Sequence, residues 1–151
     1  MARTLTSADY RSLAEFRYQI RRFLRFSEQA VAAAGLEPAQ HQVLLAVKAL
    51  AGERSPRISE LAERLQVQHH SAVELVDRLE AAGYVRRQRD GADRRQVLVL
   101  LTPHGEQVLR RLSLHHRAEL RTRGRLLIAA LQRVVRPGRP RKSWKLQAKN
   151  G

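Results

Sequence analysis

Residues 58–101 contain the feature that most restricts the fold: two short helical patterns followed at once by a hairpin pattern. The first, ISELAERL, places apolar residues at helical spacing, and Ser59 is its expected N-cap. The second, HHSAVELVDRLEAAG, repeats this spacing after a tight connection and ends at Gly83. Two short helices joined in this way are typical of a helix-turn-helix.

The next segment predicts a β-hairpin, because YVRRQR (84–89) and RQVLVLL (95–101) are strand-like runs separated by a short turn. Three of its apolar residues are expected to alternate toward the helices: Val85, Val97 and Val99. A helix-turn-helix with such a hairpin is a winged helix, whose second helix can enter the major groove of DNA while the hairpin reaches a minor groove. The alternative for Arg94 and Arg95 at the hairpin tip is an ordinary solvated turn.

Amphipathic helices flank this unit on both sides. Ser7 is the expected cap of the first helix, which ends near Gly35, and Pro38 suits the first turn of the next one. After the hairpin, Thr102 is expected to cap a further helix, and Gly124 to divide the remainder into two terminal helices. The apolar stripes exceed what one small domain needs, which favours a partner chain over one larger internal core.

Composition narrows the class of protein. The 151 residues suit one domain, and the formal charge of +15 makes DNA, RNA or an anionic membrane the first partners to consider. The lack of cysteine excludes disulfides, thiolate metal ligands and thiol-based redox sensing. Because no secretory signal or membrane-spanning run is found, we expect a soluble cytoplasmic protein without a membrane partner.

No pattern in the chain predicts catalysis or a metal site. Four of the six histidines form two adjacent pairs, and neighbours on a helix point about 100° apart, so they cannot easily share one metal. The chain has no glycine-rich phosphate loop, no nucleophile elbow and no H-E-x-x-H motif. We therefore expect no enzyme activity, no cofactor and no bound metal.

Residues 136–151 differ in composition from the rest of the chain. They hold six basic residues and no acidic one, together with Pro137, Gly138 and Pro140. This composition predicts a disordered basic tail after a single domain over residues 1–135.

The run from ISELAERL through LVDRLEAAGYVRRQRDGADRRQVLVLLTPHG resembles the MarR family of bacterial transcription regulators. The most specific part is D-R-R at residues 93–95, followed by an apolar strand and L-T-x-x-G at residues 101–105. The resemblance implies a mainly α fold with a small β-hairpin wing (α+β). It places a winged helix at about 38–101 between dimerisation helices at about 8–34 and 103–135. It also implies a homodimer that binds a palindromic operator in double-stranded DNA, usually as a repressor released by a small-molecule effector.

The resemblance also implies roles for individual residues. In the family the arginine two positions after the aspartate enters the minor groove and the aspartate steadies it, which points to Arg95 and Asp93, while Arg94 suits a phosphate. Early positions of the second helix are the candidates for base or phosphate contact: Gln68, His69, His70 and Ser71. Glu74 is expected to pair with Arg78 four residues later, with a cytosine contact as the alternative.

A small-molecule pocket is implied between the flanking helices and the winged helix, and its candidate lining residues are Tyr18, Arg22 and His41. The predicted function is a sequence-specific DNA-binding transcription regulator. The alternative is a sequence-tolerant architectural protein that binds nucleic acid through charge, which the basic tail favours.

Overall fold

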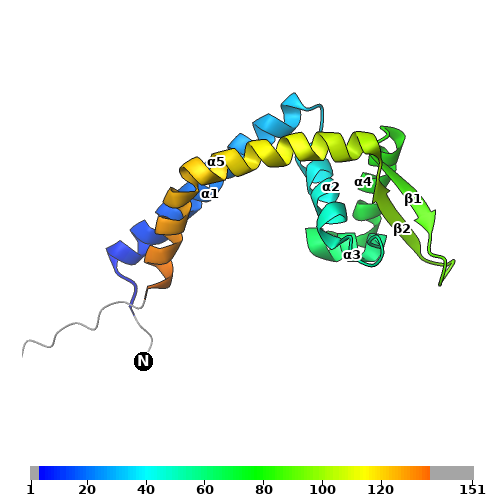
Figure 1. The fold of residues 1–151 in the computed structure, drawn as a ribbon. Coiled ribbons are helices and arrows are strands. Elements are labelled where there is room, and N and C mark those ends of the chain that lie inside the picture. Colours follow the sequence, from blue (N-terminus) through cyan, green and yellow to red (C-terminus); the bar gives the residue numbers. More distant parts are fainter. Residues whose placement is uncertain (1–3, 137–151) are drawn as a thin grey trace, which may run out of the picture.

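The computed structural model describes residues 4–136, and this part of the chain is mainly helical with one small sheet (Figure 1). The elements in chain order are α1 (Ser7–Ala33), α2 (Pro38–Leu50), α3 (Ile58–Leu65), α4 (His69–Ala81), β1 (Val85–Arg89), β2 (Val97–Leu101) and α5 (Pro103–Val135). The predicted fold class, mainly α with a β-hairpin wing, is confirmed. The predicted tail lies outside the described residues except for Arg136. No helix within residues 4–136 is long and apolar enough to cross a membrane.

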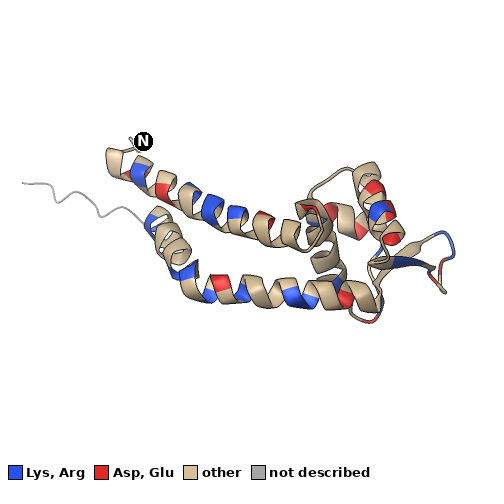
Figure 2. Ribbon diagram, turned by 90° about the horizontal axis from the view of Figure 1, so that it is seen from above, with Lys and Arg blue, Asp and Glu red and all other residues tan. Residues whose placement is uncertain are grey.

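Helices α1 and α5 run antiparallel, side by side, and form an arm that extends away from the other elements (Figures 1 and 2). Thr6, not Ser7, is the N-cap of α1: its hydroxyl accepts from the Asp9 N–H at 3.2 Å, and the Asp9 carboxylate accepts from the Thr6 N–H at 2.7 Å. The predicted break at Gly124 is wrong, because α5 continues through it. A helical glycine costs only about 0.5–1 kcal/mol relative to alanine, which packing along α1 can outweigh.

The helix-turn-helix consists of α3 and α4. The expected cap of α3 is wrong by two residues, because Arg57 is the N-cap and Ser59 lies inside the first turn. The Arg57 N–H donates to the Glu60 carboxylate at 2.7 Å, and this bond stabilises the helix start in place of a Ser59 cap. The tight connection to α4 is made by Gln66, whose φ of 56° lies in the left-handed region, and Gln68 is the N-cap of α4.

The hairpin pairs Val85 with Leu101 at its base and Arg89 with Val97 at its tip. The predicted inward residues Val85 and Val99 are fully buried, Val97 is half-buried, and Leu98, on the opposite side of the strand, is also buried. Leu98 is covered because the segment before α3 pairs with this strand: Leu98 forms a β-bridge with Arg57, and the Val99 N–H donates to the Pro56 carbonyl at 2.9 Å.

One core joins the helix-turn-helix, the hairpin and the adjoining ends of the arm. Its fully buried side chains include Val31 of α1, Leu44 of α2, Leu61 of α3, Leu79 of α4 and Val99 of β2. Each buried aliphatic side chain stabilises the fold by about 1.5–3 kcal/mol relative to exposure. This shared core fixes the position of the hairpin relative to α4.

Candidate nucleic-acid interface

The first turn of α4 presents an open helix N-terminus. The N-cap residue Gln68 makes no side-chain cap hydrogen bond within the described part of the chain. The first amide N–H groups of α4 are therefore available to an anion, which helix N-termini commonly bind. Gln68, His69 and His70 are exposed and Ser71 is half-buried, so the four predicted contact residues lie together at this turn.

Glu74 lies one turn further along α4 and is also exposed. The predicted pair with Arg78 is wrong, because Arg78 Nη1 lies 3.4 Å from Oε2 of Glu37, the N-cap of α2. Helices α2 and α4 pack together, which brings a carboxylate from another element within reach of Arg78. Among residues 4–136, Glu74 has no ion-pair partner, so its carboxylate adds negative charge beside the first turn of α4.

The tip of the wing is braced by hydrogen bonds to its main chain. Asp93 Oδ1 accepts from the Arg95 N–H at 3.0 Å, and Asp90 Oδ1 accepts from the Ala92 N–H at 3.0 Å. The Asp90 N–H donates to the Gln96 carbonyl at 3.0 Å. Asp93 therefore holds Arg95 by its backbone and not by its guanidinium.

Arg94 and Arg95 are exposed, and neither forms an ion pair within the part of the chain that the structure describes. The Arg94 carbonyl accepts from Arg89 Nη1 at 2.9 Å, so a third arginine braces the tip. Two exposed guanidinium groups on a braced turn suit contact with phosphates or with a narrow minor groove, where negative potential is enhanced.

Arg87 fixes the base of the wing to α4, a role that was not predicted from the sequence. Its Nη1 donates to Glu80 Oε1 at 2.8 Å, its Nη2 to Asp77 Oδ1 at 2.5 Å, and its N–H to Glu80 Oε2 at 2.8 Å. The two carboxylates raise the pKa of Arg87, against the opposing effect of its burial. Strand alternation is the signal that could have found this residue, since Arg87 shares a face with the buried Val85.

Asp90 links the tip of the wing to the start of α3. Its Oδ2 lies 3.5 Å from Arg57 Nη2. The Ala92 N–H, and then the Arg57 guanidinium, hold the pKa of Asp90 below its usual range. The wing is thus attached to the helix-turn-helix at both of its ends, at Arg87 and at Asp90.

The three predicted pocket residues lie in two places. Tyr18 and Arg22 line a hollow on the outer side of α1, where the Arg22 guanidinium carbon lies 5.8 Å from the centroid of the Tyr18 ring. His41 is buried, and its ring stacks on that of His116 with centroids 4.9 Å apart. Burial, and then the neighbouring His116, lower the pKa of His41. The structure brings Tyr18 and Arg22 together and places His41 in the interior.

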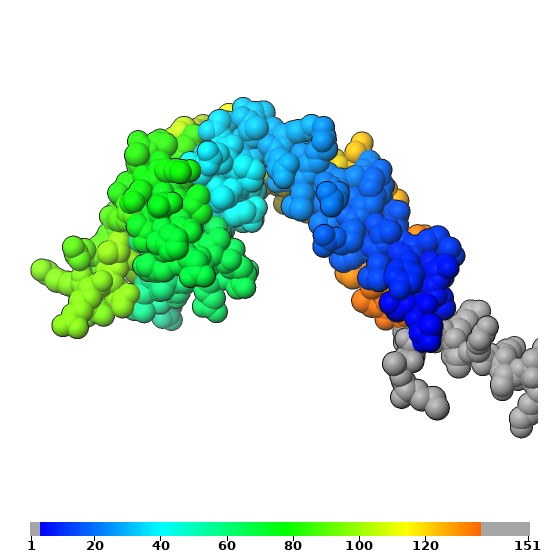
Figure 3. Space-filling view, turned by 180° about the vertical axis from the view of Figure 1, so that it is seen from behind, coloured from blue at the N-terminus to red at the C-terminus, as the bar shows by residue number. Residues whose placement is uncertain are grey.

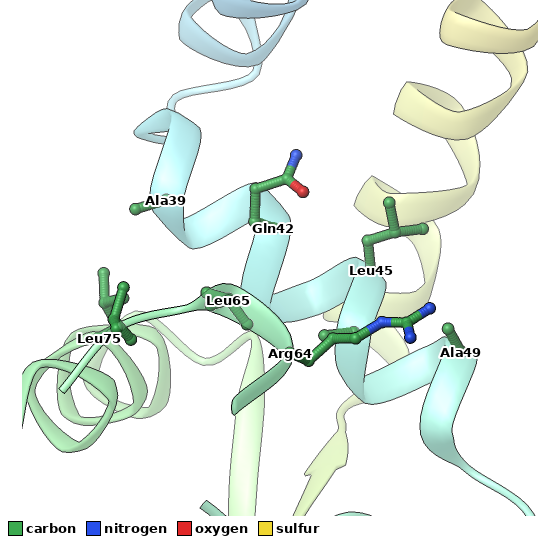
Figure 4. Close-up of a pocket in the computed structure, with 9 residues that line it drawn as sticks. Ala39, Gln42, Leu45, Ala49, Arg64, Leu65 and Leu75 are labelled. Atoms are coloured by element: carbon green, nitrogen blue, oxygen red, sulfur yellow. The ribbon is translucent and has the colours of Figure 1, made fainter. Parts of the chain in front are cut away.

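A cavity of about 440 Å³ opens between α2, α3 and α4 (Figure 4). Its lining is mostly apolar: Ala39, Gln42, Leu45, Ala46, Ala49, Arg64, Leu65, Val67 and Leu75. Arg64 is the one charged residue of this lining, and its side chain extends toward Ala49 in Figure 4. The cavity was not predicted, because it arises from the spacing of three helices and no residue pattern marks it.

The fold and this surface define a winged helix-turn-helix protein, with the open end of α4 and the tip of the hairpin as its two exposed contact regions. Within residues 4–136, no group of three or more histidine, aspartate or glutamate side chains could hold a metal ion.

Comparisons with known proteins show similarity to one family. Residues 34–96 match the family model described as MarR family. The solved structure of AbsC, a MarR family transcriptional regulator from Streptomyces coelicolor, is similar with 25% identity and a TM-score of 0.72, over 90% of this chain and 95% of AbsC. Residues 34–96 are therefore similar to the MarR family, and the whole described fold is similar to that of AbsC, as the sequence resemblance predicts.

Two further solved structures show the same fold with a ligand in place. A mutant of MepR from S. aureus, bound to an oligodeoxyribonucleotide, is 20% identical with a TM-score of 0.62, over 79% of this chain and 82% of MepR. CouR from Rhodococcus jostii RHA1 bound to p-coumaroyl-CoA is 24% identical with a TM-score of 0.60, over 77% of this chain and 85% of CouR. No curated protein sequence matches the chain.

Proposed function

We propose that the chain is a sequence-specific DNA-binding transcription regulator that binds a palindromic operator as a homodimer. The observation that carries this proposal is the attachment of two exposed contact regions to one core: the open first turn of α4 and the braced tip with Arg94 and Arg95. In such folds the helix reads the major groove while the wing reaches the adjacent minor groove. The oligodeoxyribonucleotide bound to MepR supports DNA as the partner.

The homodimer is supported by apolar side chains that the arm leaves exposed. Leu13 and Leu24 lie on one face of α1, and Ile128, Leu131 and Val135 lie at helical spacing on α5, each more than 40% exposed. Packing of α1 against α5 does not cover these side chains. A second copy would cover them and place two winged helices on two half-sites about one helical turn of DNA apart.

In this proposal the regulator acts as a repressor, and binding of a small ligand releases it from DNA. CouR bound to p-coumaroyl-CoA supports a small-molecule effector. The cavity beside Leu65 and Leu75 suits an apolar acid, because it has an apolar lining and the single guanidinium of Arg64. Such a ligand would contact α3 and α4 directly. Tyr18 and Arg22 on α1 are a second candidate location.

The test begins with a genome-wide footprint, which identifies the operator, followed by affinity measurements on operator and random duplexes. We expect Arg95→Ala to cost about 1–3 kcal/mol on the operator and to relax preference at its flanks, because a minor-groove contact is position-specific. Arg94→Ala should weaken both duplexes together, as removal of a phosphate contact does. Unchanged operator affinity in Arg95→Ala, or an unfolded variant in a thermal melt, would contradict the minor-groove role.

The second candidate function is a sequence-tolerant architectural protein, and the distribution of charge favours it. Residues 34–102, which include the winged helix, hold ten basic and nine acidic residues, so the strong positive charge lies elsewhere. Competition with random DNA at several salt concentrations separates the two functions. A regulator keeps a large ratio of operator to random affinity as salt rises, whereas an architectural protein does not.

A further inference from the structure

Glu74 lies on the outermost face of α4. The buried residues of this helix are Ala72, Val76 and Leu79. At 3.6 residues per turn, Glu74 points about 140–160° away from each of them. His70, one turn earlier, lies on the same outward face and is also exposed. A helix that lies in the major groove presents this face to the base pairs, and its N-terminal residues contact the base edges.

Among the residues that the structure describes, Glu74 is the one acidic residue of α4 without a cation partner. Asp77 and Glu80 both accept from the Arg87 guanidinium. Arg78, four residues after Glu74, lies instead 3.4 Å from the N-cap carboxylate of α2. The carboxylate of Glu74 therefore keeps its full capacity to accept hydrogen bonds from a donor outside this part of the chain.

Few groups of a DNA major groove can donate a hydrogen bond to a carboxylate. The base edges offer two such donors, the N4 amine of cytosine and the N6 amine of adenine. Adenine presents the N7 acceptor beside its amine, and this acceptor repels a carboxylate. Guanine and thymine present only acceptors and the thymine methyl group, and the phosphates repel a carboxylate through their charge. Cytosine is therefore the base that suits Glu74 best.

We propose that Glu74 determines specificity by selecting a cytosine in each half-site, whose N4 amine donates a hydrogen bond to the carboxylate. This inference rests on the proposed function, because it requires α4 to lie in the major groove of an operator. Glu74 lies about 6 Å further along the helix axis than His70, against about 3.4 Å per base pair, so the two residues reach different base pairs. Where no donor faces it, the carboxylate loses water and gains only repulsion, which disfavours other sequences.

The face of α4 that carries Glu74 lies apart from the surface proposed for the dimer. Figure 3 shows the winged helix at one end of the molecule and α1 extending away from it. The apolar side chains proposed for the dimer belong to α1 and to the second half of α5. A second copy that covers them therefore leaves Glu74 to contact DNA.

The test uses the full chain to select duplexes from a random-sequence library, so no operator has to be known in advance. We expect the parent motif to hold a cytosine at one position of each half-site. Glu74→Gln should replace it with adenine at that position alone, because glutamine binds N6 and N7 of adenine. Replacing the cytosine of one half-site by thymine should weaken binding of the parent about tenfold, in the lower range for one base contact. The same replacement should weaken Glu74→Ala far less, and this double-mutant cycle isolates the contact.

Glu63→Gln is the matched control, because Glu63 is an exposed residue of α3 with no ion-pair partner among residues 4–136. Both glutamine variants lose one negative charge and should bind random duplexes more tightly, but Glu63→Gln should keep the cytosine. An unchanged motif in Glu74→Gln, or the same change of motif in Glu63→Gln, would overturn the inference. It would also be overturned if the position that Glu74→Gln alters held a base other than cytosine in the parent motif. A parent that selects no motif would overturn the proposed function and this inference together.

Discussion

Asp93 acts on Arg95 through the main chain. The sequence resemblance implies that the aspartate steadies the arginine, and the hydrogen bond of 3.0 Å runs from the Arg95 N–H to Asp93 Oδ1. This bond needs a side-chain oxygen acceptor at residue 93 but no negative charge. Asparagine provides the same acceptor, whereas alanine does not.

We expect Asp93→Asn to bind the operator at least as tightly as the parent and Asp93→Ala to lose about 1 kcal/mol relative to Asp93→Asn, the usual contribution of one hydrogen bond. Removal of the negative charge can only strengthen attraction to DNA, so any loss of affinity in Asp93→Ala reports the hydrogen bond. Operator titrations of both variants at equal salt measure this difference. A loss in Asp93→Asn as large as in Asp93→Ala would show that the carboxylate acts through its charge.

His41 and His116 stack in the interior where α2 meets the arm. His116 Nδ1 lies 2.6 Å from the Leu112 carbonyl and must donate to it, so in the neutral ring Nε2 accepts from the Ser27 hydroxyl at 2.7 Å. Burial, with the adjacent His116, lowers the pKa of His41 below its ordinary value of 6.5. The folded protein therefore favours the neutral form of His41.

Acid should destabilise the fold partly through His41. Between its lowered folded pKa and about 6.5, the unfolded chain binds more protons, so this stability is complete above about pH 6.5 and is lost as pH falls through the folded pKa. We expect the Tm of His41→Phe to fall less than that of the parent when the pH is lowered from about 7.5 to 5.5. His69→Phe, at an exposed histidine, is the control, and its Tm should fall as much as that of the parent. An equal fall in Tm for all three proteins would exclude His41 as a source of the acid destabilisation.

At the scale of the element, the two glycines of α5 differ in the space that surrounds them. Gly105 lies in the first turn, where the Thr102 hydroxyl accepts from the Gly105 N–H at 3.1 Å and donates to the Gly83 carbonyl at 2.6 Å. A Cβ on Gly105 would overlap the Tyr84 carbonyl, whereas a Cβ on Gly124 would meet the Leu120 side chain at 3.8–3.9 Å, an ordinary contact. The glycine of the L-T-x-x-G motif is thus required by packing between α5 and the end of α4.

Two alanine substitutions on the same helix should therefore have opposite effects. We expect Gly105→Ala to destabilise the protein by more than about 2 kcal/mol, because backbone must move to remove the overlap. Gly124→Ala should stabilise it by about 0.5–1 kcal/mol, the difference in helix propensity. Urea denaturation measures the free energy of unfolding of both variants. A destabilised Gly124→Ala would mean that a second chain approaches α5 closely at this glycine.

Sequence patterns predict the existence of these elements better than their ends. Apolar spacing and the turn residues between the two strand-like runs are enough to predict the winged helix, because both are local features of the sequence. The starts of α1 and α3 were not predicted correctly, since Thr6 and Arg57 are selected by acidic residues three positions later, at Asp9 and Glu60. Strand alternation indicates that Arg87 faces the same side as Val85, but its carboxylate partners could not be predicted, because they belong to α4 and meet it only after folding.

At the scale of the whole molecule, the arm and the winged helix differ in charge. The winged helix is nearly neutral, and its helix α4 carries the exposed Glu74. The arm holds the surplus positive charge, and it also holds the apolar side chains proposed for the dimer. The surplus positive charge and the side chains proposed to read an operator therefore lie in different parts of the chain.

The dimer can be tested by placing charge in its proposed apolar contact. We expect Ile128→Asp/Leu131→Asp to sediment as a monomer, because burying two carboxylates without partners costs several kcal/mol. The monomer should bind a half-site as the parent protomer does and lack the gain in affinity that two linked half-sites provide. Leu45→Asp, at a similarly exposed leucine of α2, is the control and should remain dimeric. A monomeric parent chain, or a double variant that stays dimeric at the same concentration, would show that these residues of α5 are not the interface.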